Sequence, residues 1–216
     1  MGEGGAAELA QAGAGSGSRG GRAGGDPRPG MVLTYWLDEV GPEGWYAEDE
    51  ARDAEIRERF GAMWDHAMEG ALSLWLTYPS GALAYIVLTD QFSRNMWRGT
   101  AKAFASDRVA IAAAKAALSR DWDLRIDEPA RQFFYLPLMH AECLPDQQRS
   151  VRLIQMRMPE TGASNLLHAK AHREVIRRFG RFPHRNEPLG RETTPSEGAF
   201  LEDGGYGAVV RQIQAG

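Results

Sequence analysis

Apolar residues recur along most of the chain at the three-to-four spacing that is typical of helices. Between residues 49 and 70 one face of a predicted amphipathic helix carries Ile56, Phe60, Met63, Trp64, Ala67 and Met68. The short apolar run VLTYWLDEV at 32–40 fits either a strand or a first helix, and its periodicity does not decide between them.

Further helices are predicted from their ends. Ser80 is a fitting N-cap for GALAYIVLTDQF, which is apolar on nearly every side and therefore predicts a buried central helix. Thr100 is expected to cap a long Ala-rich helix through about Ser119. Within RQFFYLPLMHAE, Pro137 must kink or break the helix because proline lacks an amide donor.

The C-terminal third predicts three more helices. Asp146 is expected to begin one that runs to about residue 158, and Ser164 or Asn165 caps another that stops at Gly180. The TPSE sequence that begins at Thr194 is a capping box for a short last helix over about 195–202.

Six to eight helices with brief connections favour an all-α fold of antiparallel hairpins packed in layers. No repeat with a period of 34 residues is detectable, so the sequence alone does not establish a solenoid. A length of 216 residues suits one domain with a single substantial core. We therefore expect a single all-helical domain over residues 31–216.

The first thirty residues contrast with the rest of the chain. They contain 11 Gly and 6 Ala, with scarcely an apolar side chain larger than Ala, so burial cannot offset the entropy of ordering them. They resemble neither a secretory signal nor a mitochondrial transit peptide. We expect a disordered leader at 1–30 and a native start at Met31.

Charge and cysteine content limit the classes of partner and the compartment that the sequence predicts. Lys plus Arg at 25 against Asp plus Glu at 29 gives a net charge of -4, which supplies no global field for nucleic acid or anionic lipid. No run of 18 apolar residues predicts a membrane span. The lone Cys143 excludes an internal disulfide framework and fits a reducing compartment. We expect a cytoplasmic protein with neither nucleic acid nor membrane as partner.

Four long strings carry a family resemblance: TDQFSRNMWRGT with AFASD over 89–107, FFYLPLMHAE at 133–142, HREVIRRFGRFPHRN at 172–186 and LGRETT at 189–194. By these strings the chain resembles the bacterial family catalogued as domain of unknown function 924 over essentially everything after Met31. The resemblance implies an all-helical architecture similar to tetratricopeptide-like arrays and no established activity. Where the family usually has H-S-E this chain has Ala141, so a catalytic serine is excluded at that position.

One segment concentrates positive charge. Six arginines between residues 172 and 191, set against Glu174 and Glu187, leave a local charge of +4. Guanidinium groups bind phosphate and carboxylate through paired hydrogen bonds, so an anionic small molecule or an acidic peptide is the matching partner. The alternative is that these arginines pair with Asp90, Glu142, Glu174 and Glu192 and clamp the loop to the core.

A second polar cluster, from Asp90 to Arg98, closes the central helix. Asp90 is expected to orient either Arg94 or a residue of the later loop, and a purely structural role fits the cluster as well. The predicted ligand-binding residues are Asp90, Arg94, Asn95, Arg98, His172, Arg173, Arg181, His184, Arg185, Asn186 and Arg191. His168 and His172 stand four apart, which is a metal-ligand spacing, but too few further ligands accompany them to predict a metal. No glycine-rich phosphate loop or other motif predicts a cofactor.

Three functions remain open. The first is a binding module for an anionic small molecule or peptide. The second is a hydrolase or lyase of a phosphorylated or carboxylated substrate, with His140 or His184 as general acid-base and Glu142 as a neighbouring carboxylate. The third, a protein-interaction scaffold, follows by analogy from helical arrays. An enzyme requires a histidine that faces an enclosed pocket, close to a carboxylate and an arginine.

Overall fold

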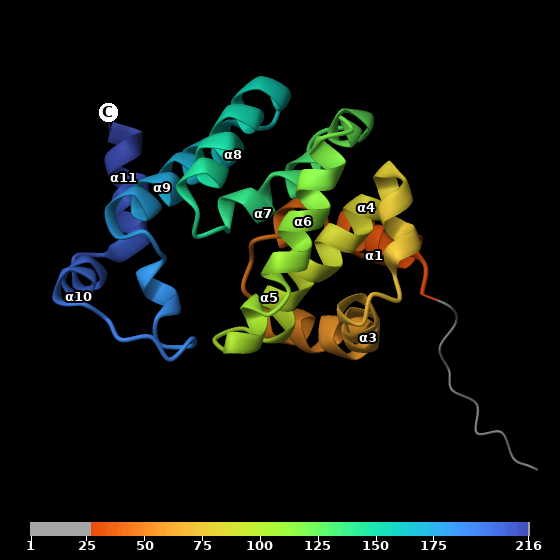
Figure 1. Ribbon diagram of the computed structural model, residues 1–216, viewed down its shortest axis with the longest axis horizontal. Helices are drawn as coiled ribbons and strands as arrows, with labels where there is room; N and C mark the ends of the chain where they lie inside the picture. Colours follow the sequence, from red (N-terminus) through yellow and green to blue (C-terminus); the bar gives the residue numbers. More distant parts are fainter. Residues whose placement is uncertain (1–26, 216) are drawn as a thin grey trace, which may run out of the picture.

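Helical periodicity is realised throughout residues 27–215, the part of the chain that the computed structural model describes (Figure 1). No strand occurs within this part, so the fold is all-α. The α-helices are α1 Pro29–Leu33, α2 Gly41–Gly44, α3 Glu50–Met68, α4 Pro79–Ile86, α5 Ser93–Met96, α6 Asp107–Leu118, α7 Leu136–Met139, α8 Leu144–Arg157, α9 Ala163–Phe179, α10 Pro195–Glu202 and α11 Gly205–Ala215. Residues 1–26 of the predicted leader lie outside the described part of the chain, and the leader's predicted end at residue 30 was wrong, because Pro29 and Gly30 already belong to α1.

Shorter helical segments join these helices. Two are π-helical, Thr34–Val40 and Val87–Phe92. The others are 3-10 turns at Ser73–Thr77, Ala101–Phe104, Trp122–Arg125, Ala130–Phe134 and Pro183–Arg185. The stretch 32–40, which periodicity left open, is therefore helical.

Helix α3 confirms the predicted amphipathic face. Asp49 is its N-cap, and the Asp49 carboxylate accepts hydrogen bonds from the amides of Ala51 at 2.9 Å and Arg52 at 3.1 Å. The predicted apolar positions are buried except Met68, which is 38% exposed at the last turn.

The central helix runs without interruption from Pro79 to Met96 and is buried on nearly every side (Figure 1). Its N-cap is Tyr78, not Ser80 as predicted, because Pro79 has the fixed φ and the missing amide donor that suit a first helical turn. Its middle turn is π-helical and contains Asp90. Single π turns inside α-helices are frequent at functional sites.

Two predicted helices are broken. The helix expected from Thr100 to Ser119 is divided into a 3-10 turn and α6, because the hydroxyl of the intervening Ser106 donates to the Thr89 carbonyl and accepts from Trp64 Nε1 at 3.1 Å. Pro137 stands in the first turn of α7, after a break from the preceding 3-10 turn. The break is the outcome that proline at this position predicted.

The C-terminal third differs from prediction in its boundaries. Helix α8 begins at Leu144, two residues before Asp146, and α9 begins at Ala163, so Ser164 and Asn165 lie in its first turn instead of capping it. Gly180 ends α9 in the left-handed conformation, with φ at 71°. The capping box at Thr194 is confirmed. Helix α11 was not predicted, because its glycine-rich start gives no helical signal.

The apolar side chains form two clusters. The larger one fills the space among α1 to α8 and includes Trp36, Phe60 and Phe133. The smaller one lies between α9, α11 and the loop that follows α9, around Val175 and Phe182. A hairpin of α8 and α9 joins them, and Figure 1 shows α9 to α11 on the far side of α8 from α3 and α4. The single domain and the tetratricopeptide-like array stay predictions.

Candidate functional site

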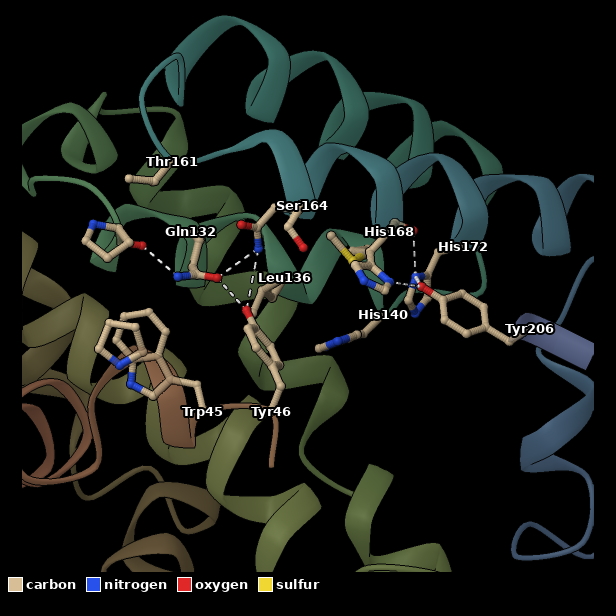
Figure 2. A pocket seen from close by; sticks show the side chains of 14 residues that line it. Trp45, Tyr46, Gln132, Leu136, His140, Thr161, Ser164, His168, His172 and Tyr206 are labelled. Carbon is tan, nitrogen blue, oxygen red and sulfur yellow. Dashed lines mark hydrogen bonds between the residues drawn. The ribbon is translucent and has the colours of Figure 1, made fainter. Parts of the chain in front are cut away.

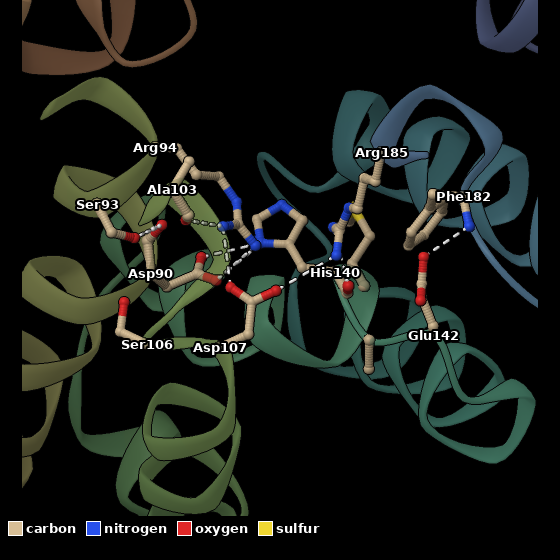
Figure 3. Close-up of polar contacts among 12 residues, drawn as sticks. Asp90, Ser93, Arg94, Ala103, Ser106, Asp107, His140, Glu142, Phe182 and Arg185 are labelled. Carbon is tan, nitrogen blue, oxygen red and sulfur yellow. Dashed lines mark hydrogen bonds and ion pairs between the residues drawn. The ribbon is translucent and has the colours of Figure 1, made fainter. Parts of the chain in front are cut away.

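A buried carboxylate and a histidine meet at the junction of the two clusters (Figure 3). Asp90 extends from the π turn of the central helix, and His140 is the residue that ends α7. His140 Nδ1 lies 2.9 Å and 3.0 Å from the two carboxylate oxygens of Asp90, and the Asp90 side chain is only 1% exposed. The two residues are fifty positions apart, so the tertiary fold alone brings them together.

The surroundings fix the charge of this pair. Burial opposes ionisation of Asp90, but the charges of His140 and Arg94 outweigh it and lower the pKa of Asp90 to about 2. Burial lowers the pKa of His140 below its usual value, and the Asp90 charge only partly offsets that effect. At neutral pH we therefore assign an ionised Asp90 and a neutral His140 that donates its Nδ1 proton.

This assignment leaves His140 Nε2 with a lone pair. Among the residues that the structure describes, Nε2 has no hydrogen-bond partner, and it is not among the buried unpartnered atoms that are sealed from solvent. A histidine held at Nδ1 by a carboxylate, with Nε2 open, is the arrangement of a general base.

Two arginines surround the pair (Figure 3). Arg94 lies 3.4 Å from the Asp90 carboxylate and 3.0 Å from that of Asp107. Arg185 lies 3.3 Å from the same Asp107 and donates to the backbone carbonyl of His140 at 3.0 Å. Arg185 thus holds the backbone that carries the histidine.

Arg185 is a buried cation with incomplete compensation. Its guanidinium carbon lies 4.7 Å from the ring centroid of Phe104 and 4.6 Å from that of Phe182, so two phenyl rings stack on it. Burial and the charge of Arg94 lower the pKa of Arg185 to about 10. Arg185 Nε has no hydrogen-bond partner among the described residues. The charge of Arg185 is therefore incompletely compensated, which favours a further negative group nearby.

His140 lines two cavities, which we name by their linings. The arginine cavity encloses about 330 Å³. It is lined by Asp90, Phe104, Asp107, Arg108, Ile111, Pro137, His140, Ala141, Glu142, Arg185 and Leu189. Its carboxylates are all engaged, whereas Arg108 has no ion pair within residues 27–215. Donors are therefore in excess in the arginine cavity.

The neutral cavity is larger, at about 560 Å³ (Figure 2). It is lined by Pro42, Trp45, Tyr46, Pro129, Gln132, Leu136, Met139, His140, Thr161, Ser164, Asn165, His168, His172 and Tyr206. This lining contains no Asp, Glu, Lys or Arg. Its lining residues come from both apolar clusters and include residues of α9 and α11.

At one end of the neutral cavity three aromatic side chains share a hydrogen-bond network (Figure 2). The Tyr206 hydroxyl lies 2.7 Å from His168 Nδ1 and 3.1 Å from His172 Nδ1, and His172 Nδ1 is also 2.9 Å from the His168 carbonyl. The pattern assigns the His172 proton to Nδ1, where it faces two oxygens, and lets Tyr206 donate to His168. His172 Nε2 then carries a lone pair, as His140 Nε2 does.

At the other end an amide network orders the wall. Asn165 Nδ2 donates to Gln132 Oε1 at 2.8 Å, and the Tyr46 hydroxyl donates to the same oxygen. Gln132 Nε2 in turn donates to the Pro129 carbonyl at 2.8 Å. The Asn165 carbonyl oxygen is left as an acceptor.

Other residues of the predicted set lie outside both cavities. Asn95 and Arg98 bind Asp53 at 2.8 Å. Arg181 pairs with Glu197 at 2.6 Å and contacts the Glu192 carbonyl, and Asn186 reaches the same Glu197 at 3.3 Å. The contacts of Arg181 and Asn186 fasten the loop after α9 to α10, through Glu197 and not through the carboxylates that the clamp alternative named.

The remaining predicted residues have different places. Glu142 lines the arginine cavity but binds Arg191 at 2.7 Å and the Phe182 amide at 2.8 Å, so it does not orient His140. His184 is exposed beside Phe182, and Arg173 stands on α9; neither lines the two cavities. The structure thus groups Asp90, Arg94, His140 and Arg185, with the His172 ring centroid 6.2 Å from that of His140 in the lining of the neutral cavity.

Sequence reasoning missed most of the neutral cavity. Tyr46, Gln132 and Tyr206 come from three distant segments and belong to no motif. The one available signal was the α9 face on which Ser164, His168 and His172 recur every four residues. No group of three or more His, Cys, Asp or Glu placed to hold a metal occurs within residues 27–215. No helix in that range has the length and apolar character to cross a bilayer.

Comparisons with known proteins place the chain among relatives. The model of the family described as bacterial protein of unknown function (DUF924) matches residues 32–205. A solved structure of a protein of unknown function from Agrobacterium tumefaciens is similar, with 40% sequence identity and a TM-score of 0.76. The similarity covers 81% of this chain and 97% of that one. A search of curated proteins finds no match.

Proposed function

Because the chain belongs to the bacterial DUF924 family, whose description assigns no activity, we propose a function from the geometry around His140. We propose that the protein is an enzyme that binds a small anionic molecule and uses His140 as a general acid-base. The observation that carries the proposal is the buried Asp90–His140 pair, whose Nε2 atom is open to solvent and whose histidine lines two cavities. This arrangement supports an enzyme, because a histidine faces a cavity and lies close to a carboxylate and to an arginine.

The pair supports hydrolysis or elimination. In hydrolysis, His140 Nε2 takes a proton from a water molecule as the water oxygen attacks the substrate, and the imidazolium then returns this proton to the leaving group. Asp90 stabilises the imidazolium and holds its orientation. In elimination, Nε2 takes the proton from carbon, and the departing group leaves with the electron pair. Neither step requires a cofactor.

The arginine cavity supports an anionic substrate. Its carboxylates are occupied by Arg94, Arg185, Arg191 and His140, while the lining residue Arg108 has no ion pair within residues 27–215. A phosphate or carboxylate brings the acceptors that this arginine lacks. It also relieves the repulsion between the two arginines, which lowers the pKa of Arg185.

A non-catalytic binding module is the second candidate. The surplus of donors in the arginine cavity favours it, because that surplus is independent of the His140 lone pair. In such a module Asp90 and His140 would only order the cavity wall.

The first experiment measures anion binding by thermal shift with inorganic phosphate, simple carboxylates and phosphorylated metabolites. We expect wild-type protein to be stabilised by one anion class, and Arg185→Met to lose about tenfold or more of the affinity. Methionine retains an apolar stem between Phe104 and Phe182. The control is Arg177→Met, whose arginine is 62% exposed on α9. Equal responses of the two variants would refute the arginine cavity.

The second experiment separates the enzyme from the module. The anions that bind are tested for turnover, with His140→Gln as the variant that removes the base. We expect turnover to fall by about 10²–10⁴-fold in His140→Gln while anion affinity changes little. Tight binding without turnover in any of these compounds favours the module.

A further inference from the structure

The neutral cavity differs in chemistry from the site of the proposed anion. Every one of its lining residues is uncharged in type or is a histidine, and it is the larger of the two cavities beside His140. We propose that the neutral cavity binds an uncharged group of the ligand that has an apolar face and donates hydrogen bonds through hydroxyl or N–H groups. This inference rests on the proposed function only in placing the reacting bond at His140.

The histidines do not supply charge to this cavity. Burial, with the neighbouring His140 charge, lowers the pKa of His172 to about 3. Burial also lowers the pKa of His168 and of His140. All three are neutral at physiological pH, so an ionic group placed here would lose its hydration without gaining a counter-charge. The cavity therefore selects against ions of both signs.

The free polar atoms of the cavity are mainly acceptors. His140 and His172 each hold a proton on Nδ1, so their Nε2 atoms are acceptors, and their ring centroids lie 6.2 Å apart. Asn165 uses its amide nitrogen on Gln132, which leaves its oxygen free to accept. A ligand that satisfies these atoms must donate, as alcohols and amides do. Two lining residues can donate: His168, which accepts at Nδ1 and offers Nε2–H, and Ser164 through its hydroxyl, which can also accept.

The remaining wall is apolar. Trp45, Leu136 and Met139 are almost fully buried and line the cavity together with two prolines. Trp45 Nε1 is already engaged by the Trp36 carbonyl at 2.7 Å, so the indole presents only apolar surface. A volume of about 560 Å³ lies within the range of small-molecule pockets.

The test uses three probes of one size that differ in charge: benzyl alcohol, benzoate and benzylammonium. Affinities are measured by protein-observed NMR titration of the wild-type protein, and again in the Arg185→Met variant, which lacks the competing anion site but also lacks the Arg185 contact to the His140 carbonyl. We expect benzyl alcohol to bind at least about tenfold more tightly than either ion. His172→Phe, which keeps a ring but removes the acceptor, is expected to weaken benzyl alcohol several-fold.

A matched pair of variants locates the binding. Ser164→Trp places a bulky ring in the first turn of α9 at the cavity, and Ser196→Trp makes the same change in the first turn of α10, outside it. We expect only Ser164→Trp to abolish benzyl alcohol binding, while phosphate binding to protein with intact Arg185 survives in both. Benzoate binding as tight as benzyl alcohol and equally sensitive to Ser164→Trp would overturn the inference. Absent benzyl alcohol binding alongside intact phosphate binding would also overturn it and leave the proposed function standing.

Discussion

The neutral cavity and the arginine cavity share His140 but differ in the charge of their other lining residues. The arginine cavity contains buried charges that compensate one another incompletely, with Asp107 shared by Arg94 and Arg185. The neutral cavity excludes charge and keeps its three histidines deprotonated by burial. One histidine, His140, therefore lines both an ionic and a non-ionic cavity. Asp90 is the group that holds it there.

Removing the Asp90 charge should have the largest effect, because it breaks the centre that both cavities share. Asp90→Asn leaves Arg94 with one carboxylate fewer in a buried site and no longer fixes the His140 tautomer. We expect the free energy of unfolding to fall by about 3 kcal/mol, as measured by urea denaturation. Asp107→Asn, at a partly exposed carboxylate, is the control with a smaller loss. Equal losses would show that Asp90 has no special place.

Acid should have the next largest effect, in part through His172 in the neutral cavity and in part through His184 outside it, whose pKa burial lowers to about 4. The folded-state pKa of His172, about 3, lies below the ordinary value of 6.5, so between these values the unfolded chain binds more protons. Stability therefore falls as pH falls, by up to about 2 kcal/mol from pH 6.5 to about pH 5. The low pKa of Asp90 keeps its ion pair intact across this window.

Urea denaturation at several pH values measures this slope. We expect His172→Phe to reduce it, because the variant has no group to protonate at that position. His66→Phe, at an exposed position of α3, should leave it unchanged. A slope that is the same in all three proteins would contradict the assignment of a buried neutral His172.

Salt should have a smaller effect, and it should change the affinity of the arginine cavity more than that of the neutral cavity. Because ions screen attraction between charged groups, phosphate binding should weaken by about threefold or more between 0.05 M and 0.5 M sodium chloride. Benzyl alcohol binding, measured by NMR in the same buffers, should change little. If both ligands respond alike, the difference in charge between the cavities does not govern binding.

The smallest expected effect concerns the contacts of Thr194, Arg181 and Glu197, which fasten the loop after α9 to α10. Thr194 caps α10 and shares Glu197 with Arg181. Thr194→Ala should lower the free energy of unfolding by about 1 kcal/mol. We expect benzyl alcohol affinity to remain unchanged, since Thr194 does not line the neutral cavity. Ser196→Ala, in the same turn, serves as the denaturation control.

The elements with strong local signals were predictable. The face of α3 follows from apolar spacing, the end of α9 from Gly180, and the capping box from Thr194 and Glu197. The starts predicted at Ser80 and Asp146 were wrong, because prolines decided them. Thr100 does precede a helical segment, but that segment ends before Ser106 instead of continuing to Ser119. Helix α11 had no such signal.

The site was predictable only in part. Sequence proximity suggested Glu142 as the partner of His140, whereas the structure pairs His140 with Asp90 through a π turn that no local pattern reveals. Of the two partners that the sequence suggested for Asp90, Arg94 is in contact with it, at 3.4 Å. Ligand binding by the predicted residues stays a prediction. The lining residues of the neutral cavity, such as Tyr206, are uncharged and come from distant segments. No charge pattern in the sequence therefore indicates that they lie together.

The π turn of the central helix also makes this helix intolerant of a change in length. A π turn holds one residue more than an α-helical turn, and that residue shifts the register of everything that follows it. Deleting one residue between Val87 and Phe92 would restore ordinary α-helical geometry but rotate the downstream side chains by about 100° relative to the preceding turn. Asp90 could then face His140 only if Arg94 turned away from it. In this chain the number of residues in the segment is therefore tied to the Asp90–His140 pair that it presents.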